Sequence, residues 1–198
     1  MRKTLDQLIS WTGLILAAVL LVAGGLLTWA SSFVTSNVSE QLTAQHITMP
    51  GGAALTTQDM KDNLAQYSGQ PMTTGDQAKA YADHYILAHM NQASGGKSYS
   101  EVSGQFTALS KDASADPAQV TKLGELRQTL FMGNTLRGLL LYGYAFGTMG
   151  KIAGLAAIGA FAGAAIFLVL GLLGLRHATT ARDEAVGREP RREPVLQS

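Results

Sequence analysis

The sequence contains no cysteine. This excludes disulfides, thiolate metal sites, a lipoprotein anchor and cysteine nucleophiles, so a domain outside a membrane must hold together by packing alone. The formal net charge is only +1, and the basic residues form no stripe interleaved with aromatic residues, so nothing indicates nucleic-acid binding. No phosphate-binding loop, serine-nucleophile motif or carboxylate pair is recognisable. The sequence therefore predicts a protein that has no catalytic activity, cofactor or nucleic-acid partner.

Charged residues are missing from two long segments of the chain. None occurs between Asp6 and Glu40, and none occurs between Lys151 and Arg176. A helix of about 20 apolar residues crosses a hydrocarbon core about 30 Å thick. We therefore predict two transmembrane helices, one at 8–34 and one at 152–175.

The first apolar segment also resembles a secretory signal, with Thr28 and Ala30 at the position of a cleavage site. However, the apolar core of a signal is about 7 to 15 residues long, which is shorter than this segment, and Trp29 would stand beside the scissile bond. We interpret the segment as a retained membrane anchor.

Four residues are predicted to mark the membrane interfaces. Trp11 and Trp29 lie roughly 27 Å apart along a helix, which is close to the hydrocarbon thickness. Tryptophan favours the headgroup region, although both rings are also explained as lipid-facing side chains without positional meaning. Lys151 and Arg176 bracket the second span.

Basic residues at both ends of the chain predict its orientation. Five arginines follow the second span, and the first span is preceded by Arg2 and Lys3. The positive-inside rule places both termini in the cytoplasm of a multi-pass plasma-membrane protein. The predicted order is a cytoplasmic N-terminus at 1–7, the first span at 8–34, an extracytoplasmic helical domain at 35–134, an aromatic interfacial helix at 135–151, the second span at 152–175 and a cytoplasmic Arg-rich tail at 176–198.

Small residues recur along both spans. Gly159 and Gly163 form a GxxxG pair, which permits close helix packing in lipid. The first span offers matching small residues at Gly13, Ala17, Ala18, Gly24 and Gly25. Either the two spans pack within one chain, or the GxxxG pair joins two copies as a homo-oligomer.

The segment between the spans reads as a series of short helices. Val34, Val38 and Leu42 continue the first span as an amphipathic helix that ends near His46. Helix starts are predicted from Thr56 with Asp59, Thr74 with Gln77, Ser98 with Glu101, and Asp116 followed by Pro117. No stretch alternates as a strand would. The predicted fold class is all-α, with two transmembrane helices flanking a bundle-like extracytoplasmic domain.

Residues 135–151 are rich in aromatic and apolar side chains, including Tyr142, Tyr144 and Phe146. This helix either lies on the membrane or packs into the domain, with Lys151 at the outer membrane surface. An exposed aromatic face here would be a surface for a protein partner or a lipid.

Polar and aromatic residues concentrate in the segment 81–89. Tyr81, Asp83, His84 and Tyr85 are candidates for a ligand pocket, and partly exposed positions on a helix explain them equally. His84 and His89 are five residues apart, which turns their side chains about 140° from each other on an α-helix. They therefore do not share a face as the histidines of HExxH zinc sites do.

Three stretches carry a family resemblance: residues 80–85, 96–101 and 136–146. Set between two spans, they resemble a group of small actinobacterial membrane proteins of uncharacterised function, over nearly the whole chain. Some of that group are labelled aromatic ring-opening dioxygenases. Such an activity implies iron held by two histidines and one carboxylate, for which His84 and His89 are the histidines to nominate.

Three functional hypotheses follow from the sequence. The leading one is a membrane-anchored interaction or scaffold protein of the cell envelope, whose partners are the bilayer and an envelope protein or a second copy. The second is a sensor whose helical domain binds a small ligand near Tyr81, His84 and Tyr85. The third is the iron-dependent ring-opening enzyme that the resemblance implies.

Overall fold

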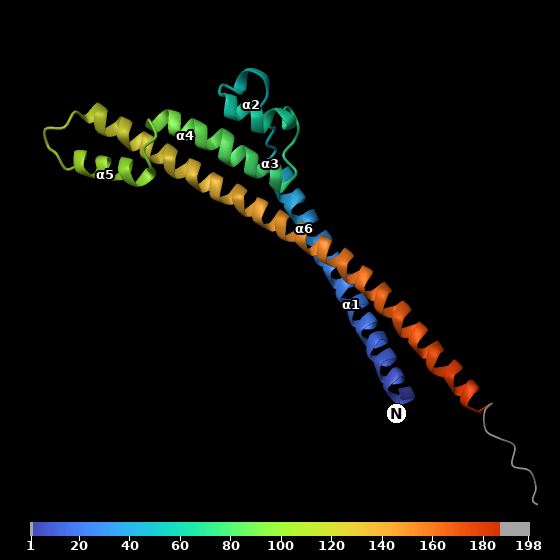
Figure 1. Ribbon diagram of the computed structural model, residues 1–198. Coiled ribbons are helices and arrows are strands. Elements are labelled where there is room, and N and C mark those ends of the chain that lie inside the picture. Colours follow the sequence, from blue (N-terminus) through green and yellow to red (C-terminus); the bar gives the residue numbers. More distant parts are fainter. Residues whose placement is uncertain (1, 187–198) are drawn as a thin grey trace, which may run out of the picture. The chain divides into compact units, whose positions relative to one another are not determined.

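The structure is a computed structural model that describes residues 2–186, and every regular element in them is helical (Figure 1). The described residues contain no β-strand, only an isolated bridge between Thr48 and Pro71. The prediction of an all-α fold is therefore confirmed. The elements are α1 (Arg2–Thr43), η1 (Gly52–Ala54), α2 (Gln58–Leu64), η2 (Ala65–Tyr67), α3 (Gly75–Ala80), the π-helix η3 (Tyr81–Ile86), α4 (Leu87–Ser94), α5 (Tyr99–Leu109) and α6 (Pro117–Val186).

The chain divides into two compact units. One unit, here called the apolar unit, combines α1 up to Ala30 with α6 from Ile152 onward. The other, here called the helical domain, comprises Ser31–Lys151. Helix α6 continues through residues 176–186, the first part of the predicted tail, and residues 187–198 with Arg188, Arg191 and Arg192 lie outside the described residues.

Both helices of the apolar unit are long and apolar enough to cross a membrane. Most of their large side chains are exposed, among them Val22, Leu26, Leu155 and Ile158. A core helix of a soluble protein buries such side chains, because their exposure to water is unfavourable. Exposure on this scale is typical of side chains that meet lipid.

Small residues let α1 and α6 approach closely within the apolar unit. Ala17, Ala157 and Ala164 are buried, and a Cβ atom on Gly171 would lie 3.1 Å from the Ser10 carbonyl oxygen. Of the GxxxG pair, Gly163 faces α1, where a Cβ atom would lie 3.2 Å from Leu20. A Cβ atom on Gly159 would meet no described atom within 4 Å. The contact between the helices therefore follows Ala157, Ala164 and Gly171, spaced by seven residues.

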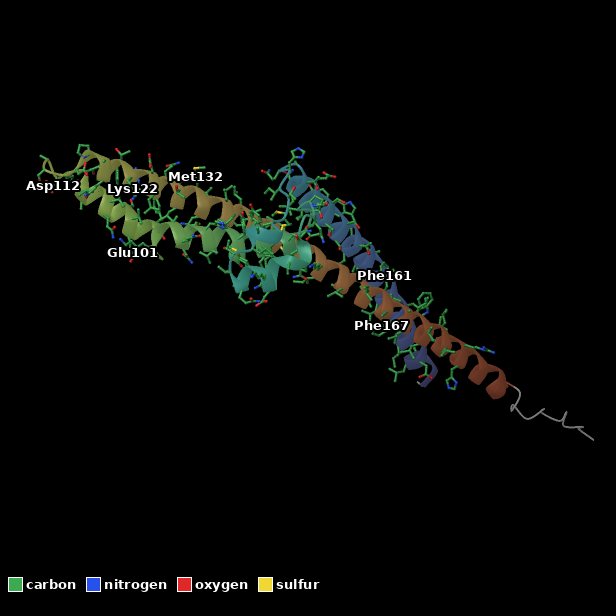
Figure 2. All side chains as sticks on the ribbon, turned by 90° about the horizontal axis from the view of Figure 1, so that it is seen from above. Glu101, Asp112, Lys122, Met132, Phe161 and Phe167 are labelled. Atoms are coloured by element: carbon green, nitrogen blue, oxygen red, sulfur yellow. The ribbon has the colours of Figure 1, made fainter. Side chains whose placement is uncertain are left out.

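The helical domain has two small cores. The first joins the C-terminal end of α1 to α2, α3, the π-helix and α6, through Leu42, Leu64, Ala78 and Leu140 together with three almost fully buried methionines, Met49, Met60 and Met72. The second joins α4, α5 and α6 through Met90, Val102 and Leu130. Figures 1 and 2 show the result: α4 and α5 lie along the first part of α6, with Glu101 on α5 and Lys122 on α6 exposed to solvent.

Side-chain caps set most of the helix starts. Thr74 with Gln77 and Ser98 with Glu101 form complete capping boxes, as the sequence predicts. The Asp116 carboxylate accepts a hydrogen bond from the Ala118 amide at the start of α6. The predicted cap of α2 is wrong by one residue, because the side chain that accepts from the Met60 amide belongs to Thr57 and the Thr56 hydroxyl donates to the Met60 sulfur instead.

Two predicted helix boundaries also differ from the structure. Helix α1 ends at Thr43 rather than near His46, and His46 adopts a left-handed backbone with φ of 52°. The segment 135–151 is not a separate helix, because α6 runs through it without interruption. Glycines in this stretch are compatible with a continuous helix because several contact other helices: Gly143 faces Leu42, and Gly147 faces Gly75.

Gly75 allows the closest approach between α3 and α6. A Cβ atom there would lie 2.8 Å from the Tyr144 Cα and 2.9 Å from the Gly143 carbonyl oxygen. Both neighbours are backbone atoms of a long helix, so they have little freedom to move aside. Gly75 therefore fixes how deeply α3 and the following π-helix sit against α6.

We predict that Gly75→Ala destabilises the protein by about 1–3 kcal/mol, because the added methyl group overpacks this contact. Gly138→Ala is the matched control on α6, where a Cβ atom meets no described atom within 4 Å. This control should be neutral or stabilising by about 0.5–1 kcal/mol, since alanine favours a helix. Thermal unfolding in detergent, followed by circular dichroism, measures both changes. Equal melting of Gly75→Ala and the wild type would contradict the predicted contact.

Candidate functional site

The helical domain contains a cavity of about 780 Å³, here called the main cavity. Its walls come from α1 between Phe33 and Leu42, from α6 between Leu136 and Phe146, and from Gln45, Ile47, Tyr81 and Ile86. The volume lies within the range of about 300–1,000 Å³ that is usual for small-molecule sites. Most of the lining side chains are aliphatic or aromatic, as such sites require.

The polar part of the main cavity is small and uncharged. Asn37 and Gln41 stand at successive turns of α1, Gln45 lies in the turn that follows α1, and the Tyr81 side chain comes from the π-helix. Among the described residues, no Asp, Glu, Lys or Arg lines this cavity. The arrangement suits a molecule that is mainly apolar and has few hydrogen-bonding atoms.

A second cavity of about 690 Å³, here called the side cavity, adjoins the first. It lies among the π-helix, α4 and α6, and its polar lining includes Tyr85, His89 and Thr129. Tyr81, Ile86 and Leu136 line both cavities, so the two spaces share a wall.

Tyr81 and Tyr85 of the π-helix and His89 of α4 form an aromatic row along the side cavity, and Tyr81 also lines the main cavity. The Tyr81 and Tyr85 ring centroids are 5.0 Å apart, and those of Tyr85 and His89 are 4.3 Å apart. Burial, followed by the charge of Tyr85, raises the pKa of the Tyr81 phenol above its ordinary value of 10.0, so this hydroxyl keeps its proton at neutral pH. π-helices are rare and occur frequently at functional sites.

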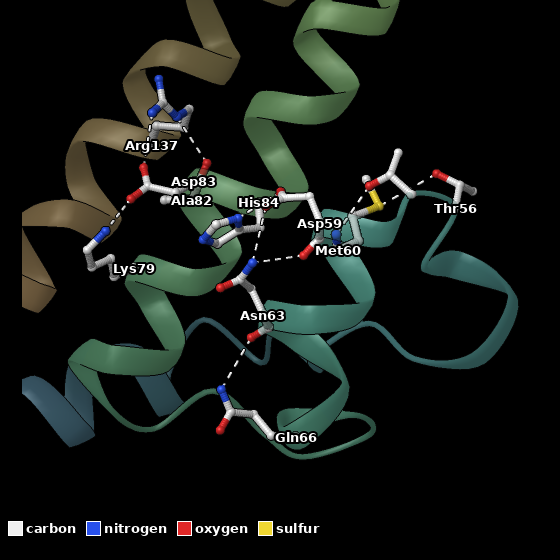
Figure 3. A network of polar contacts seen from close by, with 11 residues as sticks. Thr56, Asp59, Met60, Asn63, Gln66, Lys79, Ala82, Asp83, His84 and Arg137 are labelled. Atoms are coloured by element: carbon white, nitrogen blue, oxygen red, sulfur yellow. Dashed lines mark hydrogen bonds and ion pairs between the residues drawn. The ribbon is translucent and has the colours of Figure 1, made fainter.

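Arg137 attaches the π-helix to α6 (Figure 3). Its Nε–H donates to the Ala82 carbonyl oxygen at 3.0 Å, and its Nη2–H donates to the Asp83 carboxylate at 3.1 Å. The same Ala82 oxygen accepts from the Leu87 amide five residues later, which is the π-helical hydrogen bond. Lys79 donates to the other Asp83 oxygen at 2.6 Å. We call these three side chains the Asp83 cluster.

Electrostatics favour the ionised form of Asp83. Burial alone raises its pKa, but hydrogen bonds from Lys79 and Arg137, with the charges of both, outweigh this effect and hold the pKa below the ordinary aspartate value. The side chains of Asp83 and Arg137 are 24% and 21% exposed, so the pair is shielded from most of the solvent. The cluster therefore serves as a structural attachment of the π-helix.

His84 attaches the π-helix to α2. Its Nδ1 atom lies 2.8 Å from an Asp59 carboxylate oxygen, and Asn63 donates to the other oxygen of Asp59 (Figure 3). Asp83 and His84 are thus engaged in contacts with neighbouring elements, whereas Tyr81 and Tyr85 line the cavities. The structure does not bring the four candidate pocket residues together around one ligand space.

The three residues of the candidate partner surface also separate. The Tyr142 side chain is 66% exposed, and Phe146 lines the main cavity. Tyr144 packs inside the domain, where its backbone lies against Gly75 and its ring lies 5.6 Å from the Lys79 ammonium group.

The four candidate interface residues lie on α1 and α6. Trp11 and Trp29 are exposed on α1 in the apolar unit, and Arg176 lies on α6. Lys151 forms an ion pair with Asp76 on α3, and both side chains remain largely exposed. Lys151 therefore connects the end of the helical domain to α3.

The structure places His84 and His89, the histidines that the family resemblance nominates, in separate contacts. His84 contacts Asp59, whereas the His89 ring contacts Tyr85 and its Nδ1 atom lies 2.7 Å from the Tyr85 carbonyl oxygen. In the part of the chain that the structure describes, no group of three or more His, Asp or Glu side chains is arranged to hold a metal ion.

The sequence interpretation missed Arg137 and both cavities. Arg137 carries no local signal, because its two acceptors lie about 55 residues earlier in the chain. The amides at Asn37, Gln41 and Gln45 do recur at intervals of four residues, along the end of α1 and into the turn that follows it. That row, beside the apolar row of Val34, Val38 and Leu42, is the one sequence signal that could have indicated the main cavity.

Comparison of this chain with protein-family models, curated protein sequences and solved structures finds no match.

We predict that Asp83→Asn lowers stability at neutral pH by about 1–3 kcal/mol, because it weakens charge-assisted hydrogen bonds to two cations. In the wild type this contribution is fully present above the ordinary aspartate pKa and is lost as the pH falls through the lowered pKa of the folded state. Melting temperatures between pH 7 and pH 2 should therefore fall less steeply for Asp83→Asn than for the wild type. Asp62→Asn, an exposed carboxylate on α2, is the control, and identical pH profiles for wild type and Asp83→Asn would refute the prediction.

Proposed function

We propose that this protein is a two-span protein of the plasma membrane whose helical domain binds an apolar ligand. The main cavity is the observation that carries the proposal. It combines a drug-sized volume, apolar walls and a few uncharged hydrogen-bonding groups, which are the features of a ligand site.

The two long apolar helices support the membrane part of the proposal. Lipid contact removes the cost of exposing side chains such as Val22 and Leu155 to water. Basic residues at both ends of the chain favour cytoplasmic termini, so the helical domain would lie on the outer side of the membrane. The family resemblance of the sequence leads to the same arrangement.

The bilayer is the natural source of an apolar ligand. Along the chain, Phe33 follows the boundary of the helical domain by two residues, and Phe146 precedes the other boundary by five. Both side chains line the main cavity, so the cavity begins close to the points where the chain leaves the predicted spans. A lipophilic molecule dissolved in the membrane would therefore be at high local concentration near the site.

Ligand occupancy would act directly on the π-helix, because Tyr81 and Ile86 line the main cavity. The π-helix is held to α6 by Arg137 and to α2 by His84. If the helical domain has two conformations that differ in these contacts, a ligand that packs better against one of them increases the population of that conformation. This gives the sensor hypothesis a physical route from the ligand to α6.

A second candidate function is binding of an envelope protein or a second copy, as in the interaction and scaffold hypothesis. The specific observation is a run of exposed apolar side chains on α6 within the helical domain, Phe131, Leu139, Tyr142, Phe146 and Met149. An exposed apolar surface of this kind commonly marks an interaction site. Leu139 and Phe146 belong to the cavity wall, whereas Tyr142 does not, which allows the two functions to be distinguished.

We predict that thiol labelling will show both ends inside the cell. Because the chain has no cysteine, single replacements provide unique labels. In intact cells a membrane-impermeant maleimide should react with Ala113→Cys, in the exposed loop before α6, and not with Thr4→Cys. Both variants should react after permeabilisation. Labelling of Thr4→Cys in intact cells would contradict the proposed orientation.

We predict that a long-chain alcohol carrying a terminal diazirine labels the main cavity of the full-length protein in phosphatidylcholine vesicles. Peptide mass spectrometry should locate adducts in the segments 33–47 and 136–146. Leu139→Glu places a charge in the cavity wall and should reduce this labelling at least tenfold, while Tyr142→Glu on the same helix should leave it unchanged.

The same two variants test the alternative function. Binding of a protein partner through the exposed face of α6 predicts that Tyr142→Glu abolishes cross-linking to that partner. Labelling that is spread evenly over both spans and unaffected by Leu139→Glu would rule out the proposed ligand site.

A further inference from the structure

We propose that the ligand is an uncharged lipid bearing a hydroxyl group, with its chain in the main cavity and its hydroxyl in the side cavity. This inference rests on the proposed function and assigns the chemical class and the orientation of the ligand. Tyr81, Ile86 and Leu136 line both cavities, so the two spaces lie side by side. One elongated molecule would extend from the main cavity past these side chains into the side cavity.

The absence of charged side chains from the lining of the two cavities argues against a ligand with an ionic headgroup. Phosphate and carboxylate groups are normally bound by arginine, lysine or helix N-termini. In the described part of the chain, neither cavity is lined by Arg, Lys, Asp or Glu. A phospholipid or fatty-acid anion would therefore lose its hydration without gaining an ionic partner.

Hydrogen bonding in the side cavity selects a ligand that donates. The His89 Nδ1 atom lies 2.7 Å from the Tyr85 carbonyl oxygen, which only accepts, so Nδ1 carries the proton. In the neutral ring, Nε2 is then an acceptor. The Thr129 hydroxyl donates to the Glu125 carbonyl oxygen, so its own oxygen is available to accept as well.

A hydroxyl group suits this lining because its one proton can be donated to the Thr129 oxygen or to His89 Nε2, while its oxygen accepts other hydrogen bonds. The Tyr85 phenol, which also lines the side cavity, can donate to the hydroxyl oxygen. An ether, ketone or ester oxygen accepts only, so it can pair with the Tyr85 phenol but not with His89 Nε2 or the Thr129 oxygen.

The combined length of the cavities suits a lipid chain. Along α6 the lining runs from Thr129 in the side cavity to Phe146 in the main cavity. At about 1.5 Å per residue this path is roughly 25 Å long. The Phe146 end of this path is nearer in sequence to the predicted second span. The end of the lipid's hydrocarbon chain would therefore lie toward the membrane, and the lipid hydroxyl would lie away from it.

Two photoreactive alcohols of equal length test the orientation in full-length protein reconstituted in phosphatidylcholine vesicles. The alcohol with a diazirine at the chain terminus should label segments 33–38 and 143–146 near the predicted spans. The alcohol with a diazirine beside the hydroxyl should label 85–93 and 129–133. An unlabelled alcohol should compete about tenfold better than its methyl ether or the matching carboxylate.

A matched pair of variants tests the hydrogen bond to Thr129. Thr129→Val removes the acceptor and should weaken competition by the alcohol about five- to tenfold, without changing competition by the methyl ether. Thr135→Val is the control, because the Thr135 hydroxyl donates to the Phe131 carbonyl oxygen in the same way but lines neither cavity.

The outcomes separate the inference from the proposed function. Labelling of the main cavity by both probes, with equal competition by alcohol, ether and carboxylate, would overturn the inference and leave the apolar site standing. Absence of specific labelling in both cavities would overturn the proposed function and the inference together. Labelling with the two ends reversed would overturn the assigned orientation.

Discussion

The attachment of the π-helix to α6 by Arg137 is the contact on which the candidate site depends. One guanidinium group binds the Ala82 carbonyl oxygen and the Asp83 carboxylate, and Lys79 pairs with the second carboxylate oxygen of Asp83. The π-helix is in turn a wall of both cavities, through Tyr81 and Ile86. Loss of this attachment would release the aromatic row from α6, so that a structural ion pair determines the shape of a largely apolar site.

Small residues explain why a cavity forms at this place in the helical domain. The Ser31 hydroxyl donates to the Gly150 carbonyl oxygen at 2.8 Å, which brings α1 close to α6. Gly75 brings α3 equally close to α6 at Gly143 and Gly147. The main cavity lies between these contacts and the larger side chains of the core. Long side chains from segments 33–45 and 136–146 surround it, and no protein side chain fills it. The site is thus a consequence of close contacts beside it.

Local features of the fold could be predicted from the sequence, and contacts between distant segments could not. The all-α class and the caps at Thr74 and Ser98 follow from helix periodicity and capping chemistry. The cap of α2 was placed at Thr56 because adjacent threonines offer the same hydroxyl group. Of the predicted GxxxG pair only Gly163 faces α1, and the contacts at Ala157 and Gly171 were missed, because several small-residue rows run along one span and only packing selects among them. The cavities were missed for the same reason, since the main cavity joins segments 33–47 and 136–146 and the side cavity joins segments 81–93 and 129–136.

Native mass spectrometry of the full-length protein, released from a mild detergent, tests the central claim most directly. The account predicts a one-to-one complex whose added mass belongs to a neutral hydroxylated lipid and persists under activation that removes bulk detergent and phospholipid. A spectrum that contains only the unliganded chain, or the same mixture of phospholipids that adheres to any membrane protein, would contradict it.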